Sequence, residues 1–206
     1  MRTLGREHFV NELSPAHPAA YEMEDGETVV VQTNDCHGGV VTREGVLPPN
    51  PPPANPATGP IAVKGAQPGE ALAVTIHEVK PADWGFIGGR EGERFAVVDL
   101  TGGLATYPWG LQLPVKPIIG VIGLAPPEGE VPNNTPSDWG GNLDTVDICA
   151  GATIYLPVAV PGGMLALGDV HALQGDSEGC GTGIECAAEV TLTARRVQDP
   201  LLPSVY

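Results

Sequence analysis

Residues 71–79 read ALAVTIHEV, and this stretch sets the fold class of the chain. Leu72, Val74 and Ile76 fall on one face of an extended segment, because side chains in a strand alternate with period two. Smaller or polar residues occupy the positions between them, and Pro68-Gly69 just before the stretch is a turn signal. The stretch therefore predicts a β-strand with one buried face.

Further short apolar stretches rich in β-branched residues follow along the chain. They span residues 28–33, 95–100, 118–124, 153–160, 164–167 and 189–197. Pro161-Gly162-Gly163 lies between two of them and predicts a hairpin. Residues 47–60, LPPNPPPANPATGP, predict a loop outside any sheet, because proline cannot donate the hydrogen bonds of an internal strand.

The composition favours short strands over helices. The chain has 206 residues, and its 28 glycines and 22 prolines together make up nearly a quarter of it. Both residue types disfavour long helices and suit tight turns. With 42% hydrophobic residues there is enough material for a core. We therefore expect one all-β domain over residues 1–206, a jelly-roll-like β-sandwich with long Gly/Pro-rich loops and little helix.

The charge balance narrows the class of partner. The formal net charge is -15, which argues against nucleic acid and anionic membranes, since both require a positive surface. No stretch approaches the roughly 18 apolar residues of a membrane span, and the first residues lack the apolar part of a secretory leader. We expect a cytoplasmic protein with reduced thiols that acts on a neutral or cationic small molecule.

Ionisable residues gather in residues 168–186, GDVHALQGDSEGCGTGIEC. The run holds Asp169, His171, Asp176, Glu178 and Glu185, in a chain of which only 17% is charged. Asp169 and His171 are two positions apart, so a strand would point both to one face. A carboxylate and an imidazole on one face can begin a metal site or an acid–base pair. A polar, glycine-rich hairpin with a histidine at its edge is the alternative.

Two further segments carry candidate ligands. Asp35 and His37 follow the strand predicted at residues 28–33 and either ligate a metal or form an ordinary turn. In residues 140–144, GGNLD, two glycines allow the backbone to approach a ligand closely, and Asn142 and Asp144 add an amide and a carboxylate. A Gly-Gly turn with a capping Asp144 is the alternative for that segment.

Cys180 has two interpretations. It is either a thiolate nucleophile paired with His171 or a small buried residue. We expect the buried residue, because free cysteine more often serves as a small hydrophobe.

With these motifs in place, the chain resembles the acetamidase/formamidase family. The matching segments are NPATGPI (55–61), GAQPG (65–69), GGNLD (140–144), YLPV (155–158), GDVHALQGD (168–176) and GTGIE (181–185), together with Asp35-Cys36 and Glu178. They occur in order over essentially the whole chain.

The resemblance implies hydrolysis of short aliphatic amides, such as formamide and acetamide, on a β-sandwich with a divalent metal. The metal-site candidates that it implies are Asp35, Asp144, Asp169 and His171. Glu178 is the first and Asp176 the second candidate for the base, with Glu185 as a further catalytic or supporting residue. Gly140, Gly141 and Asn142 are candidates for binding the substrate and its oxyanion. We expect zinc in preference to calcium, although oxygen ligands with one histidine suit either metal. The resemblance also implies that the chain forms a homo-oligomer.

The chain departs from the family pattern at its C-terminal end. Family members usually continue with a mixed α/β segment, whereas this sequence stops at Tyr206. Two alternatives to a complete metal amidase therefore stay open. One is a non-catalytic metal-binding subunit that needs a second chain to supply the C-terminal segment. The other is a metal-independent amidase with Cys180 as nucleophile.

Overall fold

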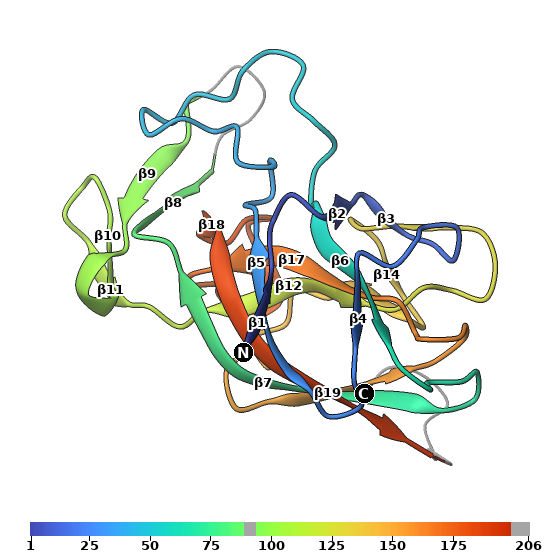
Figure 1. The fold of residues 1–206 in the computed structure, drawn as a ribbon. Helices are drawn as coiled ribbons and strands as arrows, with labels where there is room; N and C mark the ends of the chain where they lie inside the picture. The colour runs from blue at the N-terminus through green and yellow to red at the C-terminus, as the bar shows by residue number, and fades with distance from the viewer. Residues whose placement is uncertain (89–93, 199–206) are drawn as a thin grey trace.

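The structure is a computed structural model and describes residues 1–88 and 94–198. Within these residues it consists of strands and two short 3-10 helices (Figure 1). The strands are β1 (Arg2–Leu4), β2 (Phe9–Val10), β3 (Glu12–Leu13), β4 (Tyr21–Met23), β5 (Thr28–Thr33), β6 (Ala57–Val63), β7 (Ala71–Pro81), β8 (Trp84–Ile87), β9 (Ala96–Asp99), β10 (Leu104–Thr106), β11 (Gln112–Pro114), β12 (Ile118–Gly123), β13 (Val131–Pro132), β14 (Pro136–Ser137), β15 (Gly140–Asn142), β16 (Thr153–Pro157), β17 (Leu165–His171), β18 (Glu185–Cys186) and β19 (Ala188–Val197). The 3-10 helices are η1 (Thr101–Gly103) and η2 (Asp176–Glu178).

Two large sheets carry the fold. In the described part of the chain, the first has five strands in the order β1-β5-β19-β7-β16, and β7 and β19 form its long antiparallel centre. The second runs β11-β10-β9-β8-β18-β17-β12-β15-β14, with β6 also paired to β17 and to β2 and β4. Strands β8 to β11 extend to one side of the body (Figure 1). This is the all-β architecture that the sequence predicts.

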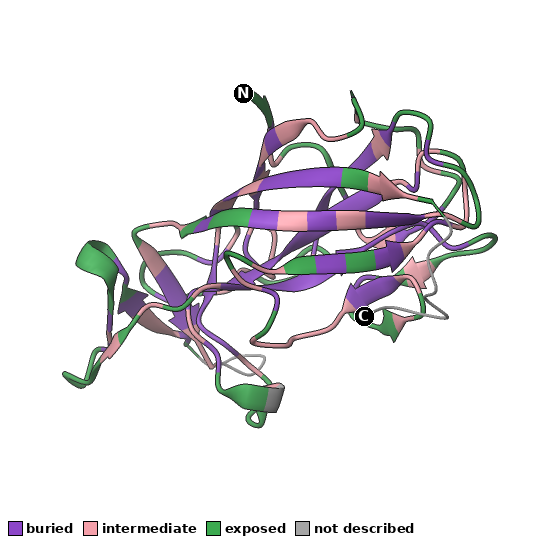
Figure 2. Ribbon diagram, turned by 90° about the horizontal axis from the view of Figure 1, so that it is seen from below, coloured by how far each residue is buried: buried purple, intermediate pink, exposed green. Residues whose placement is uncertain are grey.

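The hydrophobic core lies between the two sheets. Leu72, Val74 and Ile76 of β7 are fully buried, as their alternation predicts, and they belong to one cluster with Ile122 of β12 and Leu167 of β17. Buried residues alternate with intermediate or exposed ones along strands of the five-stranded sheet such as β7 and β16, and Figure 2 shows such changes of colour along several arrows. β17 differs because all seven of its residues are buried. It has neighbours on both edges and both faces, so side chains at its end are held rigidly.

Two sequence-based expectations about strands are wrong. The turn at Pro161-Gly162-Gly163 does not close a hairpin, because β16 pairs with β7 in one sheet while β17 pairs with β12 in the other. The turn therefore connects the two layers of the sandwich. The loop predicted over residues 47–60 is also shorter, since β6 begins at Ala57. Pro60 is tolerated there because the register between β6 and β17 shifts at this point, and such irregularities accommodate proline.

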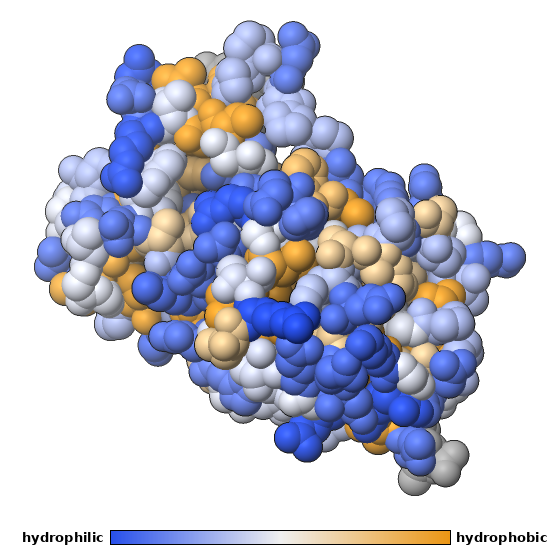
Figure 3. All heavy atoms as spheres, viewed as in Figure 1, coloured by the Kyte–Doolittle hydropathy of each residue, from blue (hydrophilic) through white to orange (hydrophobic). Residues whose placement is uncertain are grey.

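The face seen in Figure 3 is mainly hydrophilic, in keeping with the acidic composition. A small separate cluster of buried apolar residues, Val41, Phe86 and Phe95, lies where the β5–β6 connection meets β8 and β9. No helix in the described part of the chain is long and apolar enough to cross a membrane.

Candidate functional site

A pocket of about 540 Å³ opens where the end of β17 meets four connecting segments. Its lining residues are Cys36 and His37 after β5, Asn55 before β6, Gly88, Phe95, Asn142, Asp144, Asp169 and His171 of β17, and Glu178, Cys180, Gly181, Thr182 and Glu185 from the segment that leads into β18. Most of the candidates from residues 168–186 therefore converge on one cavity.

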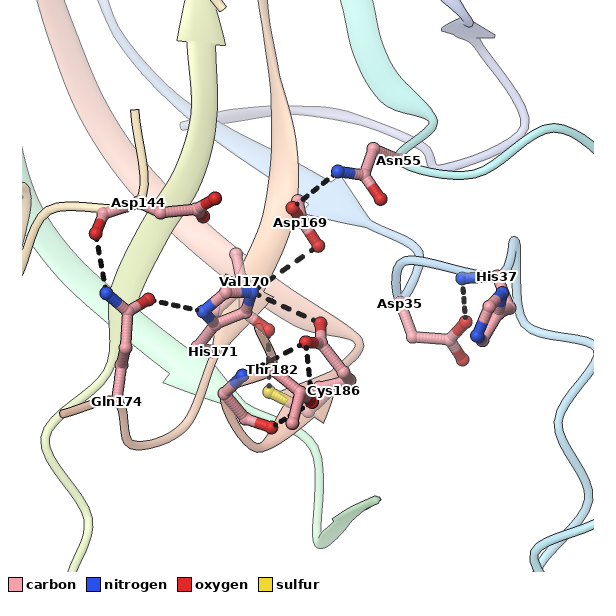
Figure 4. Close-up of polar contacts among 12 residues, drawn as sticks. Asp35, His37, Asn55, Asp144, Asp169, Val170, His171, Gln174, Thr182 and Cys186 are labelled. Carbon is pink, nitrogen blue, oxygen red and sulfur yellow. Dashed lines mark hydrogen bonds and ion pairs between the residues drawn. The ribbon is translucent and has the colours of Figure 1, made fainter. Parts of the chain in front are cut away.

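His171 is the centre of the site. It is the last residue of β17 and is 1% exposed. Its Nδ1 lies 2.7 Å from Gln174 Oε1, and Gln174 in turn donates through Nε2 to the Asp144 carbonyl at 2.5 Å (Figure 4). These two bonds fix the orientation of the imidazole, which presents Nε2 to the carboxylates on its other side.

The register between β17 and β18 brings Glu185 to His171. The two residues are directly opposed in this antiparallel pair, where side chains on one face lie within contact distance. His171 Nε2 is 3.2 Å from Glu185 Oε2 and 3.5 Å from Asp169 Oδ1. Neither contact has hydrogen-bond geometry, so these three buried atoms lack a hydrogen-bond partner among the described residues.

Asp169 is held in an unusual backbone conformation. Its φ is 53°, although it lies inside β17, so simple alternation does not determine its direction. Its Oδ2 accepts a hydrogen bond from Asn55 Nδ2 at 2.9 Å. Asn55 is itself supported by the buried Asn133, whose Nδ2 donates to the Asn55 carbonyl at 2.9 Å.

Positive φ angles recur around the pocket. Besides Asp169, the lining residues Asn55, Asp144 and Glu178 have φ values of 56°, 43° and 45°. Such conformations cost of order 1–3 kcal/mol each for some residues and cluster at ligand and active sites. The strain here falls on carboxylates and an amide that face one cavity.

The site concentrates negative charge. Asp144, Asp169, Glu178 and Glu185 line the pocket, and no lysine or arginine lines it among residues 1–88 and 94–198. Burial raises the pKa of Asp169 to about 6, against the opposing influence of His171. The pKa values of Asp144 and Glu178 are also raised, first by burial and then by neighbouring carboxylates. Burial alone would lower the pKa of His171, but Asp169 and Glu185 outweigh it and raise that pKa to about 12.

Two glycines make room for these side chains. A Cβ on Gly120 of β12 would lie 2.6 Å from Asp144 Oδ1 and 2.7 Å from the Asp169 carbonyl. A Cβ on Gly183 would lie 2.5 Å from His171 Nδ1. Real Cβ contacts are essentially never shorter than 3.0 Å. Gly183 lies in the matched segment GTGIE, although its contact with His171 is visible only in the structure, whereas no local pattern in the sequence marks Gly120.

The remaining candidates lie apart from this cluster. Asp35 is buried, but its Oδ1 accepts hydrogen bonds from the His37 and Gly39 N–H groups at 2.9 and 3.0 Å (Figure 4 shows the first). Asp35 thus closes the turn after β5 and is not a lining residue. Asp176 is exposed in η2 and does not line the pocket either.

The Gly140-Gly141 pair is placed by its neighbouring strands. Both residues are buried in β15, between β12 and β14. A Cβ on Gly140 would collide with the β12 backbone at Ile122, and one on Gly141 with the backbone of Thr135 just before β14, so close backbone packing explains the two glycines. Of the predicted substrate-binding segment, Asn142 reaches the pocket, and its buried Oδ1 has no partner within the described chain.

Cys180 and Cys36 both line the pocket, which the sequence did not predict for either. Cys180 was expected to be buried but is exposed at the pocket, because it follows η2 in a glycine-rich connection. Cys36, to which the sequence analysis gave no role, lies inside the pocket near Asp169 and Glu185. Burial, followed by the nearby carboxylates, raises the pKa of the Cys36 thiol. Asn55 and Gln174 stood in the matched segments, but only the structure places them beside Asp169 and His171.

The donor set fits a divalent metal. Ligand atoms of Asp144, His171 and Glu178 lie within 4.8 Å of one another, and so do those of Cys36, Asp169 and Glu185. Buried charges are stable when they are paired or bind a metal. Within the described chain, buried atoms of Asp144, Asp169, His171 and Glu185 lack hydrogen-bond partners, and a cation would offset the negative charge that the ion pairs of His171 leave uncompensated.

The fold and site together define an all-β protein with an acidic, histidine-centred pocket, and sequence comparison places it more narrowly. The sequence profile of the Acetamidase/Formamidase family matches residues 3–110 and 129–201. The chain belongs to this family.

Individual relatives agree with this assignment. A Schizosaccharomyces pombe protein whose name suggests a formamidase is 26% identical over 90% of this chain, and the match covers 63% of that protein. This chain thus spans less than two thirds of the length of that relative. A solved structure of a predicted acetamidase/formamidase from Thermoanaerobacter tengcongensis has a TM-score of 0.92 and 36% identity, covering 99% of this chain and 72% of the other. An acetamidase from Bacillus halodurans gives a TM-score of 0.92 and 35% identity, covering 99% of this chain and 74% of the other.

Proposed function

We propose that this chain hydrolyses short aliphatic amides, such as formamide and acetamide, to ammonia and the carboxylate with the help of a divalent metal. The observation that carries the proposal is a set of buried donor atoms of Asp169, His171 and Glu185 at one pocket, which lack hydrogen-bond partners among the described residues, in a chain of the Acetamidase/Formamidase family. Asp144, Asp169, His171 and Glu185 would hold the metal. Zinc is preferred to calcium, because a histidine among carboxylates matches the nitrogen and oxygen ligands of catalytic zinc.

Amides resist hydrolysis because their carbonyl is a poor electrophile and their amine a poor leaving group. A bound metal of this kind polarises a carbonyl and brings the pKa of bound water toward about 7. The protein residues then have to move protons and orient the amide. Gln174 fixes the imidazole of His171, and Asn55 fixes the carboxylate of Asp169.

Glu178 is our first choice for the base. It lines the pocket, is half-buried, and has a raised pKa, chiefly because of burial. A base whose pKa approaches the working pH transfers protons more effectively than an ordinary carboxylate. Glu178 would take a proton from the attacking water and pass it to the leaving nitrogen. Asn142 Oδ1 is available to accept an N–H of the amide, which would orient the substrate.

Ammonia release from formamide and acetamide tests the proposal, with Glu178→Gln compared against Asp176→Asn. Loss of a general base typically costs 10²–10⁴-fold in rate, so Glu178→Gln should lose about that much while keeping its metal. Asp176→Asn should stay near wild type, because Asp176 is exposed outside the pocket. If Glu178→Gln released ammonia as fast as Asp176→Asn, Glu178 would be excluded as the base.

A folded, metal-loaded chain that releases no ammonia would contradict the proposal as a whole. That result would favour a binding subunit that needs a second chain to supply the part present in its longer relatives. Loss of activity on alkylation of Cys180, with indifference to chelators, would favour the thiol mechanism instead.

A further inference from the structure

The turn after β5 brings Cys36 and His37 to the pocket. Asp35 is committed to the turn, because its Oδ1 accepts the N–H groups of His37 and Gly39, and its carbonyl accepts the N–H of Gly38 at 2.9 Å. These bonds hold the backbone on either side of Cys36. Asp35 therefore contributes to the pocket by positioning Cys36.

Cys36 is also fixed against the opposite wall. Its carbonyl accepts the N–H of Asn55 at 2.7 Å, and Asn55 donates through its side chain to Asp169 Oδ2 at 2.9 Å. Asn55 thus clamps the turn of Cys36 to the carboxylate of Asp169. The ligand atoms of Cys36, Asp169 and Glu185 lie within 4.8 Å of one another.

Each carboxylate beside Cys36 has one buried oxygen without a hydrogen bond among the described residues. Asp169 Oδ1 and Glu185 Oε2 belong to residues that are 3% and 6% exposed, and neither atom has a hydrogen-bond partner among the described residues. His171 Nε2 lies within 3.5 Å of both and forms ion pairs with them when protonated, but it also lacks a hydrogen-bond partner among the described residues. Cys36 adds a sulfur donor to the oxygen donors of Asp169 and Glu185, and a sulfur ligand is typical of zinc and unlike the all-oxygen sites of calcium and magnesium.

We propose that Cys36 is a thiolate ligand of the metal, in the place that the sequence had suggested for Asp35. The inference rests on the metal of the proposed function but not on the hydrolysis. On metal binding the thiol releases its proton to solvent, since the thiolate is the ligand. The competing role for Cys36 is that of a small apolar residue, because it also packs against the cluster of Val41, Phe86 and Phe95.

Cobalt substitution separates these roles. The full chain, stripped of metal and reloaded with Co²⁺, should show the near-ultraviolet charge-transfer band of a cobalt–thiolate bond. Cys36→Ser should lose this band and bind Zn²⁺ more weakly, by at least the 10–100-fold that loss of an outer-shell partner costs. Cys180→Ser is the matched control, because Cys180 lines the same pocket, and it should keep the band. A band that survives Cys36→Ser would overturn the inference.

A second measurement needs no variant and covers the case in which Cys36→Ser fails to fold. X-ray absorption at the zinc edge of the wild-type chain should show a sulfur neighbour at about 2.3 Å. A shell of nitrogen and oxygen alone would overturn the inference, as would failure of the folded chain to bind either metal. The band or sulfur shell without ammonia release would support Cys36 as a ligand while contradicting the proposed hydrolysis. Ammonia release with a sulfur-free shell would support the proposed hydrolysis while contradicting Cys36 as a ligand.

Discussion

Gly183→Ala is the perturbation that tests the geometry around His171 most selectively. The added Cβ would lie 2.5 Å from His171 Nδ1 and 2.6 Å from its Cγ, whereas ordinary contacts are 3.4–4 Å. Gly183 does not have a positive φ, so alanine adds no backbone strain of that kind. The substitution therefore acts through the imidazole, which must move and weaken its contact with Gln174.

The size of the effect follows from this overlap. The ring has to shift by about 1 Å, and a misplacement of that size at a reacting centre can cost about 100-fold in rate. Overpacking of a rigid interior costs about 1–3 kcal/mol. For a chain of this size, each kcal/mol corresponds to roughly 2–4 °C in Tm, so the expected fall in Tm is about 2–12 °C.

The assay is kcat/KM for ammonia release, together with metal content and Tm. Gly179→Ala is the matched control, because Gly179 lies in the same connection, has a φ of -59° and would place its Cβ within 4 Å of nothing. That variant should retain wild-type kcat/KM. If Gly183→Ala also retained wild-type kcat/KM and metal content, the imidazole would not be the centre of the site.

Three further predictions concern the surroundings of the site. His171→Ala should lower metal content and abolish metal-dependent turnover in a chain that remains a folded β protein by circular dichroism, and normal turnover would refute the metal assignment. Asn133→Ala removes the N–H donors to the carbonyls of Val10 and Asn55 at 2.8 and 2.9 Å. The free energy of unfolding, measured in urea, should therefore fall by about 1–3 kcal/mol, and an unchanged unfolding midpoint would contradict this prediction. The folded-state pKa of Asp169, about 6, exceeds its ordinary value of 3.8, so in metal-free protein its stabilising contribution is present at low pH and is lost as pH rises through about 6. The Tm of the metal-free wild type minus that of Asp169→Asn should therefore fall between about pH 4 and pH 6, and a constant or rising difference would count against the raised pKa.

The sequence predicted the sandwich because its strands alternate strongly. Strand β5 has the predicted bounds, and Leu72, Val74 and Ile76 face the core as expected. The pairing of strands within each sheet was harder to predict, because periodicity shows which face of a strand is buried but not which other strand is hydrogen-bonded to it. The sequence therefore predicts a hairpin turn at Pro161-Gly162-Gly163, whereas in the structure this turn connects two sheets.

The site was predicted where chemistry is concentrated in sequence and missed where it is assembled in space. Asp169, His171, Glu178 and Glu185 fall within one short run and do converge on the pocket. Cys36 and Asn55 come from distant segments, and only tertiary structure brings them to Asp169. Asp35 differs from Cys36 by one position, and the turn geometry decides which side chain enters the pocket.

Ammonia release from formamide and acetamide, measured with and without a chelator and after metal is restored, tests the central claim most directly. If the claim is correct, turnover disappears with the chelator and returns with stoichiometric zinc. Turnover that is indifferent to metal removal, or a folded zinc-loaded chain that releases no ammonia, would contradict it.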